Sequence, residues 1–400
     1  MINILFVDDE PNILEGLQRM LRSMRNDWQM SFALGGIEAL AMLKEKSIDV
    51  VVSDMKMPGI DGAKLLTEVR EHYPHIVRII LSGYSEKEMI MRSLGITHQY
   101  LSKPCDPEIL KATVKRVCAL RDLLSDENLR SLVSQMPMIP SLPTLYNELI
   151  DELAKTEPSS RKVGEIVKKD IGMTVKILQI VNSAFFGLRR RISDSNEAVE
   201  FLGLDTISSL TLGLGVISQF ESSETAIVLL AKLWEHSIAV GILANKIARF
   251  ENPAVAMDAF TAGLLHDIGE VVLAVNLPQQ FAQVNEFVDN ENISRIEAEK
   301  RVFEANHAEV GAYLLGLWGL PTQVVEAVAF HHTPSESGST DSFTALTAVH
   351  VANALHHFTK SDDSKTKQIY LDTEYLAKLG LLEKIPVWQE KFAEFITTTN

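Results

Sequence analysis

Residues 50–59 read Val-Val-Val-Ser-Asp-Met-Lys-Met-Pro-Gly, and this stretch decides the fold of the first part of the chain. A short run of β-branched residues that ends in a carboxylate, before a Pro-Gly break, predicts a buried parallel strand. In open α/β sheets, ligands bind at the carboxyl ends of the strands. We therefore expect Asp54 to lie at that edge with its carboxylate accessible. The alternative is that Asp54 only caps the next loop or helix.

Further strand patterns lie on both sides of this stretch, and helical patterns lie between them. The additional apolar runs cover residues 3–7, 29–33, 77–81 and 99–102. Strands that alternate with short helices are typical of βαβ units. Residues 1–122 are therefore predicted to form a doubly wound, five-stranded parallel α/β sheet.

Polar residues follow several of these strands at the point where each strand ends. Asp8 and Asp9 follow the first strand, Ser82 the fourth and Lys103 the fifth. Acidic side chains that converge repel one another unless a hard cation lies among them, and oxygen ligands suit Mg²⁺. The cation and Lys103 would neutralise an incoming phosphoryl group while the carboxylate of Asp54 attacks it.

The order and spacing of these residues resemble the receiver domain of two-component response regulators. The resemblance implies that a sensor histidine kinase or a phosphotransfer protein phosphorylates Asp54. It also implies that Ser82 and Lys103 contact the phosphoryl group, while the aromatic side chain of Tyr100 turns inward as the hydroxyl moves. The implied Mg²⁺ ligands are Asp8, Asp9, Asp54 and the backbone carbonyl of Lys56.

The helix expected after Pro107 carries an apolar face far beyond the sheet. Leu110, Val117 and Leu124 are seven residues apart, and the apolar pattern continues to Val133. We expect one long helix whose end, residues 123–135, is a linker packed between two domains. A dimer contact along the seven-residue seam is the alternative and would make the chain a homodimer. The Pro-rich stretch that follows marks a domain boundary.

From residue 144 onward the pattern is helical, and histidines recur in it. It resembles the HD superfamily of metal-dependent phosphohydrolases, most closely the HDOD (HD-related output) branch, over residues 136–333. The sequences Asn182-Ser183-Ala184 and Trp318-Gly319-Leu320-Pro321 support the resemblance, and residues 334–400 are expected to form a C-terminal helical extension. The residues that match or accompany the metal-site pattern are His236, His266, Asp267, His307, His331, His332 and Asn353.

This sequence departs from the catalytic pattern of the superfamily in three places. Asn353 stands where the family has a distal acid, and Glu270 stands where cyclic-dinucleotide hydrolases of the HD-GYP branch place a lysine. No Gly-Tyr-Pro motif follows His332. A cluster of imidazoles and a carboxylate suits a transition metal that activates water. We nevertheless expect these histidines to be vestigial and hydrogen-bonded in a helical core. One alternative is that they bind a metal without catalysing a reaction, and the other is that they catalyse hydrolysis.

The composition and charge of the chain argue against some classes of function. A net charge of −15 argues against a dedicated nucleic-acid binder. That alternative would depend on a helix-turn-helix-like segment at 163–184 and on the basic residues 189–191. Cys105 and Cys118 have no metal-site spacing, and no apolar run reaches the roughly 20 residues of a membrane span. We expect a soluble cytoplasmic protein.

The sequence thus predicts a response regulator whose non-catalytic output domain binds an unknown signalling protein. A phosphohydrolase gated by the receiver and a nucleic-acid-binding regulator are the alternative functions.

Overall fold

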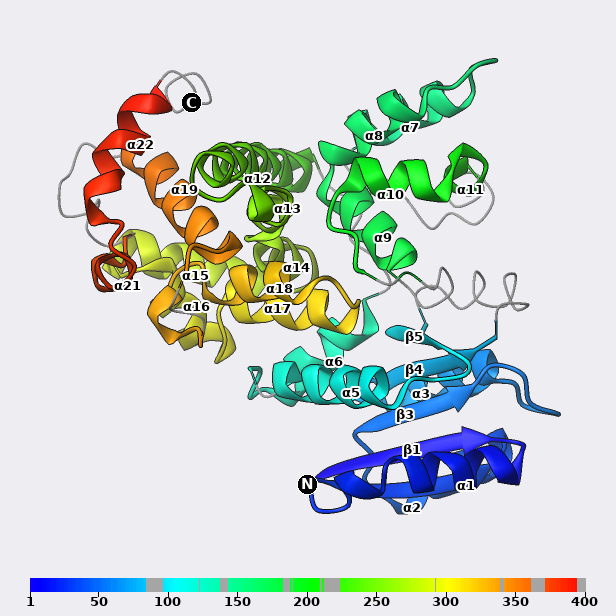
Figure 1. Cartoon of the computed structure of the whole chain (residues 1–400). Helices are drawn as coiled ribbons and strands as arrows, with labels where there is room; N and C mark the ends of the chain where they lie inside the picture. Colours follow the sequence, from blue (N-terminus) through cyan, green and yellow to red (C-terminus); the bar gives the residue numbers. More distant parts are fainter. Residues whose placement is uncertain are drawn as a thin grey trace.

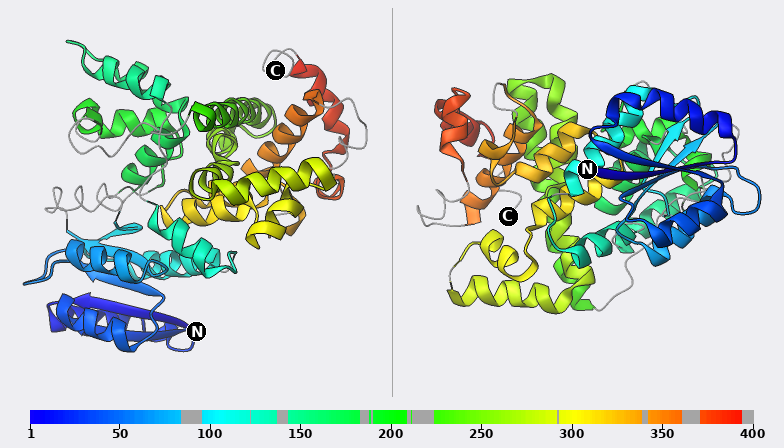
Figure 2. Two further views of the ribbon diagram at one scale, coloured as in Figure 1. Left: turned by 180° about the vertical axis from the view of Figure 1, so that it is seen from behind. Right: turned by 90° about the horizontal axis from the view of Figure 1, so that it is seen from below.

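The computed structural model places a sheet domain at the N-terminus and helical bundles after it (Figure 1). The structure describes residues 1–83, 96–121, 123–136, 143–182, 188, 190–208, 211, 224–291, 293–338, 342–360 and 371–393. Two further views show that the sheet domain lies against the bundles instead of standing apart from them (Figure 2). The two parts therefore share a packed interface.

The sheet has the predicted topology. Its strands are β1 (Ile2–Asp8), β2 (Trp28–Leu34), β3 (Val50–Asp54), β4 (Val77–Ser82) and β5 (Gln99–Ser102). They lie in the order β2-β1-β3-β4-β5, and every neighbouring pair is parallel. The prediction of a doubly wound parallel sheet is confirmed. The helix expected after Ser82 would fall on residues 84–95, which lie outside the described residues.

Helices cover both faces of the sheet, and alternate side chains of each strand explain why. Ile4 and Phe6 belong to one core cluster, whereas Leu5 and Val7 of the same strand belong to another. Successive side chains of a strand point to opposite faces, so a sheet that is buried on both sides needs apolar residues throughout. The covering helices are α1 (Pro11–Met20), α2 (Gly36–Glu45), α3 (Gly62–His72) and α5 (Pro107–Arg121).

Helix α3 begins directly beside the end of β3. The side chain of Asp61 caps it by accepting a hydrogen bond from the backbone of Lys64 at 2.8 Å. A Cβ at Gly62 would lie 2.1 Å from the backbone oxygen of Asp54. Only glycine therefore allows the helix to start so close to this strand end.

The prediction of one continuous helix after Pro107 is wrong. Helix α5 ends at Arg121, and a separate helix α6 (Glu127–Gln135) follows. The carboxylate of Asp126 accepts a hydrogen bond from the backbone of Leu129 at 2.7 Å, so a capping residue starts a new helix inside the apolar pattern. The seam residues Leu110, Val117 and Leu124 are buried within the chain itself. Intrachain packing thus accounts for their spacing.

The helical part consists of two bundles. The first has its own apolar core and contains α7 (Pro143–Leu153), α8 (Ser160–Lys168), α9 (Ile171–Val181), α10 (Ser195–Leu202) and α11 (Leu204–Ser208). The second contains α12 (Glu224–Glu251), α13 (Ala256–Leu265), α14 (Ile268–Asn276), α15 (Pro278–Glu291), α16 (Arg295–Phe303), α17 (His307–Leu317), α18 (Thr322–Phe330), α19 (Ala345–Lys360), α21 (Thr373–Lys378) and α22 (Ile385–Lys391). Short 3₁₀ turns cover Arg22–Met24, Pro253–Val255, Pro334–Glu336 and Leu382–Lys384.

The second bundle shares one apolar cluster with the sheet domain. This cluster runs from one face of the sheet through α5 and α6 into the bundle. Within the described ranges, no single helix is long and apolar enough to cross a membrane. One pair, Pro253–Asn276 with Pro278–Glu291, meets the length and composition criteria only when taken together, and it is bent by 118°.

Candidate functional site

The strand ends bring Asp8, Asp54 and Lys103 together at one edge of the sheet. The Nζ atom of Lys103 lies 2.8 Å from Oδ2 of Asp8 and 2.5 Å from Oδ1 of Asp54. Both carboxylates are almost fully buried. The backbone N–H of Lys103 donates to the carbonyl of Ser82 at 2.8 Å, which fixes the ammonium beside the ends of β3 and β4. The structure therefore assembles the cation and the two carboxylates that the sequence predicted at this edge.

Burial and charge act against each other in this group. Burial raises the pKa of Asp54, and the hydrogen bond from Lys103 only partly offsets that rise. Burial also works to lower the pKa of Lys103, but the hydrogen bonds and charges of Asp54 and Asp8 outweigh it and raise that pKa. Lys103 consequently stays charged and can neutralise anionic oxygens at this edge.

The other predicted residues surround this group. Ser82 is buried at the end of β4, and Tyr100 is buried in the core beneath the edge. Asp9 and Lys56 are exposed, and the backbone N–H of Lys56 donates to Oδ2 of Asp54 at 3.1 Å. The acidic side chains Asp8, Asp9 and Asp54 offer only oxygen ligands, the set that Mg²⁺ prefers. These residues therefore fit a magnesium site.

A second cluster forms around Asp267, between α13 and α14. Its Oδ1 lies 3.4 Å from Nε2 of His307 and 3.6 Å from Nε2 of His331. Its Oδ2 lies 3.1 Å from Nε2 of His266 and 3.4 Å from Nε2 of His236. The carboxylate thus stands between two pairs of imidazoles. His332 joins the first pair, because its Nε2 lies 3.0 Å from Nε2 of His307.

The backbone fixes which nitrogen of these rings is available as a ligand. Nδ1 of His266 lies 2.7 Å from the carbonyl of Gly263, and Nδ1 of His331 lies 2.9 Å from the carbonyl of Val328. A carbonyl only accepts, so Nδ1 donates in both rings and Nε2 is the nitrogen left to act as a ligand. Among the described side chains, these buried Nε2 atoms and that of His236 have no hydrogen-bond partner. Metal-ligating histidines are typically oriented in this way.

The pKa values of three of these histidines favour the neutral form that binds a cation, whereas that of His307 favours the protonated form. Burial lowers the pKa of His331 to about 4 and holds the pKa values of His236 and His332 well below their usual range. Burial also works to lower the pKa of His307, but Glu299 and Asp267 outweigh it and raise that pKa. Neutral imidazole is the form that binds metals. Lone pairs facing a carboxylate at 3.1–3.6 Å repel it unless a proton or a cation lies between them.

An ion pair that sequence reasoning missed lies beside the cluster. Arg295 donates from Nε to Oε1 of Glu270 at 2.6 Å and from Nη2 to Oε2 at 3.1 Å. The charge of Glu270, expected to repel a phosphate, is therefore compensated within the protein. Glu299 accepts both from Nδ1 of His307, at 2.7 Å, and from its backbone N–H, at 2.9 Å. Arg295 and Glu299 are four residues apart on α16, a spacing that could have pointed to their contact, but no local spacing links Arg295 to Glu270 or Glu299 to His307.

Helix α19 carries Asn353 and contacts His236 of the cluster. Asn353 is buried on α19, and its Oδ1 has no hydrogen-bond partner among the described atoms. One helical turn later, Nδ1 of His356 lies 2.9 Å from Nδ1 of His236. The spacing of three residues between Asn353 and His356 could have pointed to this neighbour.

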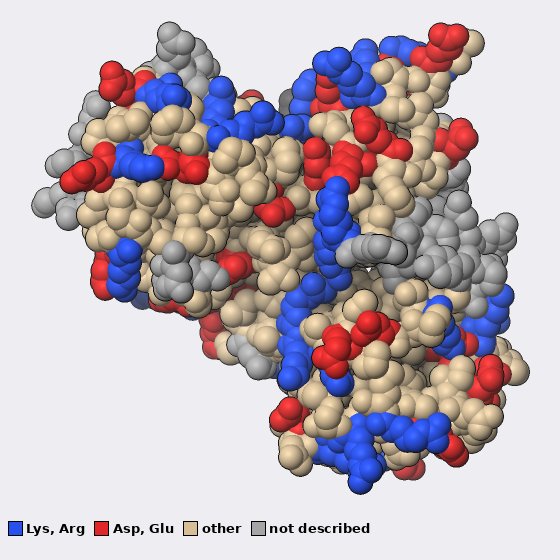
Figure 3. Space-filling model, in the orientation of Figure 1, with Lys and Arg blue, Asp and Glu red and all other residues tan. Residues whose placement is uncertain are grey.

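Two of the three basic residues on which the nucleic-acid alternative depends form contacts within the protein. Arg190 pairs with Glu197 at 2.5 Å, and Arg191 donates to the backbone carbonyl of Gly319. Arg189, like residues 183–187 of the predicted motif after Asn182, lies outside the described residues. Figure 3 shows acidic and basic side chains interspersed over one face, with a short line of basic side chains across the junction. We find no support for phosphate contacts by Arg190 or Arg191.

Comparison with protein families identifies both parts of the chain. Residues 4–115 match the response regulator receiver domain, and residues 139–334 match the HDOD domain. An uncharacterized protein of Treponema pallidum is 27% identical over 263 residues, which cover 64% of this chain and 48% of that protein. The hydrogenase transcriptional regulatory protein HoxA of Cupriavidus necator is 36% identical over 31% of this chain and 25% of its own length. The chain spans less than half the length of these curated relatives.

The chain also resembles solved structures. The MmoQ response regulator of Methylococcus capsulatus has 23% identity and a TM-score of 0.44, covering 60% of this chain and 97% of that one. An HDOD domain protein of Geobacter sulfurreducens has 19% identity and a TM-score of 0.38, covering 72% of this chain and 98% of that one.

Proposed function

Because this chain joins a response regulator receiver domain to an HDOD domain, we propose that it is a phosphorylation-controlled regulator in which Asp54 accepts the phosphoryl group. The observation that carries the proposal is the ammonium of Lys103 between the carboxylates of Asp8 and Asp54. The donor would be a sensor histidine kinase or a phosphotransfer protein.

The chemistry follows from the residues at the sheet edge. An oxygen of Asp54 attacks the phosphorus, the bond from phosphorus to the donor breaks, and an acyl phosphate forms on Asp54. Lys103 would compensate the anionic oxygens, and the hydroxyl of Ser82 at the end of the neighbouring strand β4 would donate to one of them. Mg²⁺, held by Asp8, Asp9, Asp54 and the carbonyl of Lys56, would supply further charge neutralisation.

Labelling with a small acyl-phosphate donor and Mg²⁺ tests this assignment. We expect one base-labile phosphoryl group per chain, which Asp54→Ala abolishes and the exposed control Asp27→Ala retains. The double variant Asp8→Asn, Asp9→Asn should weaken Mg²⁺ binding, because one remaining carboxylate is a poor site. Equal labelling of the Asp54→Ala protein would contradict the proposal.

We further propose that the HDOD domain holds a transition metal without turnover. The position of Asp267 between two pairs of imidazoles supports this alternative over the vestigial one. The ligands would be His236, His266 and Asp267 on one side, and His307, His331 and His332 on the other. A bound metal would lower the pKa of a coordinated water. Turnover is not part of the proposal, because Asn353 offers no carboxylate and His266, Asp267, His307 and His331 are buried.

Metal analysis of the purified chain tests the second proposal. We expect bound iron, manganese or zinc that His266→Ala removes and His72→Ala, an exposed control on α3, retains. Cyclic dinucleotides should remain intact in the presence of the protein. Far less than one metal per chain would favour the vestigial interpretation instead.

The output of the regulator is expected to be a contact with another protein. We propose an unidentified signalling protein as the downstream partner and a cytoplasmic location. Pairing of two chains remains a prediction, and light scattering before and after phosphorylation would test it.

A further inference from the structure

Helix α17 belongs to the histidine cluster at one end and contacts strand β5 of the receiver domain at the other. Its first residue, His307, is a member of the histidine cluster. At its other end, Nε2 of Gln99 donates to the carbonyls of Gly316 and Leu317, at 2.9 and 3.1 Å. A helix of 11 residues spans about 16 Å, so a single rigid element connects the receiver to the cluster.

Gln99 and Lys103 lie at opposite ends of one short segment. Gln99 is the first residue of β5, and Lys103 directly follows the last, Ser102. The segment pairs with β4 along its whole length, from Ile79 opposite Gln99 to Ser82 opposite Ser102. Any movement of Lys103 toward a phosphoryl group therefore acts on the same strand that holds Gln99.

The contact between Gln99 and α17 is buried, and both polar atoms of the Gln99 amide have hydrogen-bond partners. Gln99 is 5% exposed, and its Oε1 accepts from Nη2 of Arg116 at 3.2 Å. The last carbonyls of a helix lack partners in the regular helical pattern, and here the amide of Gln99 donates a hydrogen bond to two of these carbonyls. At Gly316, a Cβ would lie 1.9 Å from Cδ1 of Leu120, so Leu120 of α5 packs directly against the backbone of α17. The receiver therefore holds this helix end firmly.

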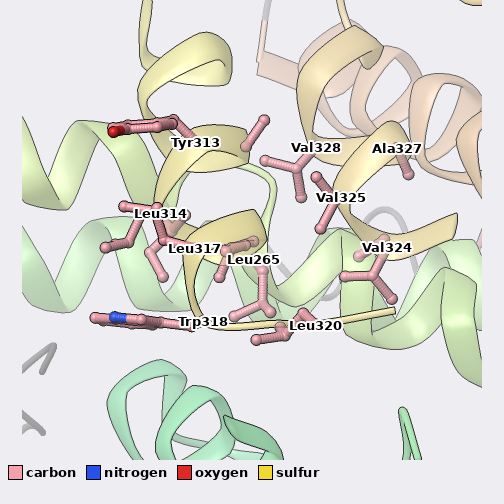
Figure 4. Close-up of a cluster of buried hydrophobic side chains, with 14 of the residues drawn as sticks. Leu265, Tyr313, Leu314, Leu317, Trp318, Leu320, Val324, Val325, Ala327 and Val328 are labelled. Carbon is pink, nitrogen blue, oxygen red and sulfur yellow. The ribbon is translucent and has the colours of Figure 1, made fainter. Parts of the chain in front are cut away.

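The rest of α17 leaves little room for independent movement. Its side chains Tyr313, Leu314 and Leu317, and Trp318 directly after it, are buried in a packed core (Figure 4). At the other end, a Cβ at Gly269 would lie 1.9 Å from the backbone oxygen of His307. Close-packed interiors transmit displacement instead of absorbing it. A shift at the Gln99 end should therefore reach His307 and change the geometry of the histidine cluster.

We propose that Gln99, acting through α17, makes phosphorylation of Asp54 and metal occupancy of the histidine cluster mutually dependent. This inference rests on the functions proposed above for the two sites. Linkage makes the effect reciprocal: if phosphorylation changes the metal affinity by some factor, metal changes the phosphorylation equilibrium by the same factor. Gln99 is a positioning residue in this scheme, because it contacts neither ligand.

A titration of the full chain with Co²⁺ tests the proposal. Saturating Mg²⁺ occupies the receiver, and the visible absorption of nitrogen-ligated Co²⁺ reports on the histidine cluster. Beryllium fluoride serves as the acyl-phosphate mimic on Asp54, and Asp54→Ala controls for direct effects of the reagent. We expect the mimic to change the Co²⁺ dissociation constant by about 5- to 150-fold in the wild type, the usual range of allosteric coupling.

Two variants at Gln99 should remove this change while leaving each site able to bind. Gln99→Ala removes the donor. Gln99→Glu keeps the size and the pairing with Arg116 but cannot donate to the carbonyls, which guards against a folding defect of the first variant. Gln29→Ala, an exposed glutamine on the opposite edge strand β2, is the matched control and should keep the full change.

The outcomes separate the coupling from the functions on which it rests. An unchanged Co²⁺ affinity in wild-type protein with fully modified Asp54 overturns the coupling. If both Gln99 variants keep the full change in Co²⁺ affinity, the coupling does not pass through Gln99 and α17. A failure of Co²⁺ to bind the cluster, or of Asp54 to be modified, overturns the proposed function instead.

Discussion

The guanidinium of Arg78 on β4 donates from Nη2 to the backbone carbonyl of Ser134 on α6 at a distance of 2.6 Å. Arg78 is 1% exposed, and it also donates to the carbonyls of Ile96 and Ile76, at 2.6 and 3.1 Å. Burial lowers its pKa to about 9, so it is still charged at neutral pH. A buried receiver cation therefore anchors the helix that follows the receiver.

Removing this cation should weaken the attachment of α6. In Arg78→Met, buried carbonyls lose their donor, at a cost of about 1–3 kcal/mol for each unsatisfied group. We expect a lower free energy of unfolding in a denaturant titration. Arg19→Met, which removes an exposed arginine 3.6 Å from Glu15, should change stability by less than about 1 kcal/mol. Equal effects of the two variants would contradict the anchoring role.

A methyl group at Gly269 should disrupt the histidine cluster. Gly269→Ala forces α14 away from the backbone of His307, and overpacking of this kind costs typically about 1–3 kcal/mol. We expect loss of both stability and bound metal. Gly16→Ala on α1 is the control, because no atom lies within 4 Å of its new methyl group. There alanine should stabilise the helix by about 0.5–1 kcal/mol.

Chelation should destabilise the metal-loaded protein. A metal that binds only the folded state at 100 times its dissociation constant contributes about 2.7 kcal/mol. A strong chelator should therefore lower the melting temperature of the wild type measured in Mg²⁺. The melting temperature of His266→Ala should not respond to the chelator. A response of equal size in this variant would place the metal elsewhere.

Lys176 predicts a specific dependence of stability on pH. It is buried on α9, and burial lowers its pKa to about 8, whereas an unfolded lysine titrates near about 10.4. The unfolded state therefore binds more protons between these values, so the free energy of unfolding rises as pH increases through this range. The rise is at most about 3 kcal/mol. Lys176→Met should lack it, so a pH-independent difference between variant and wild type from pH 8 to 10 would contradict the prediction.

Hydrogen exchange should report the signal that leaves the receiver. Phosphoryl on Asp54 adds charge at the sheet edge where β4 and β5 end. At their other ends these strands contact α6 through Arg78 and α5 through Gln99. We expect changed amide protection over residues 110–136 when an acyl-phosphate mimic is bound. Exchange in β2, at the opposite edge of the sheet, should stay the same. Unchanged protection over 110–136 with Asp54 fully modified would exclude signalling through these helices.

The sequence by itself determined the sheet and the edge at which Asp54 lies. Short apolar runs specify buried parallel strands, and parallel strands place their carboxyl ends on one side. Asp8, Asp54 and Lys103 were therefore predictable as neighbours. The resemblance of the helical part to the HD superfamily pointed to the members of the histidine cluster, although it gave no distances between them. The break between α5 and α6 was missed, because a capping aspartate interrupts an apolar periodicity that continues on both sides of it.

Only the tertiary structure decided which residues meet across the two domains. Gln99 and Gly316 are 217 residues apart in the chain, and Arg78 reaches a carbonyl 56 residues away. Arg295 compensates Glu270, although no local spacing relates them. Periodicity describes which face of an element is buried, but it does not state which element covers that face. Pairings of this kind arise when whole helices pack, so the link from β5 through α17 to His307 became visible only in the folded chain.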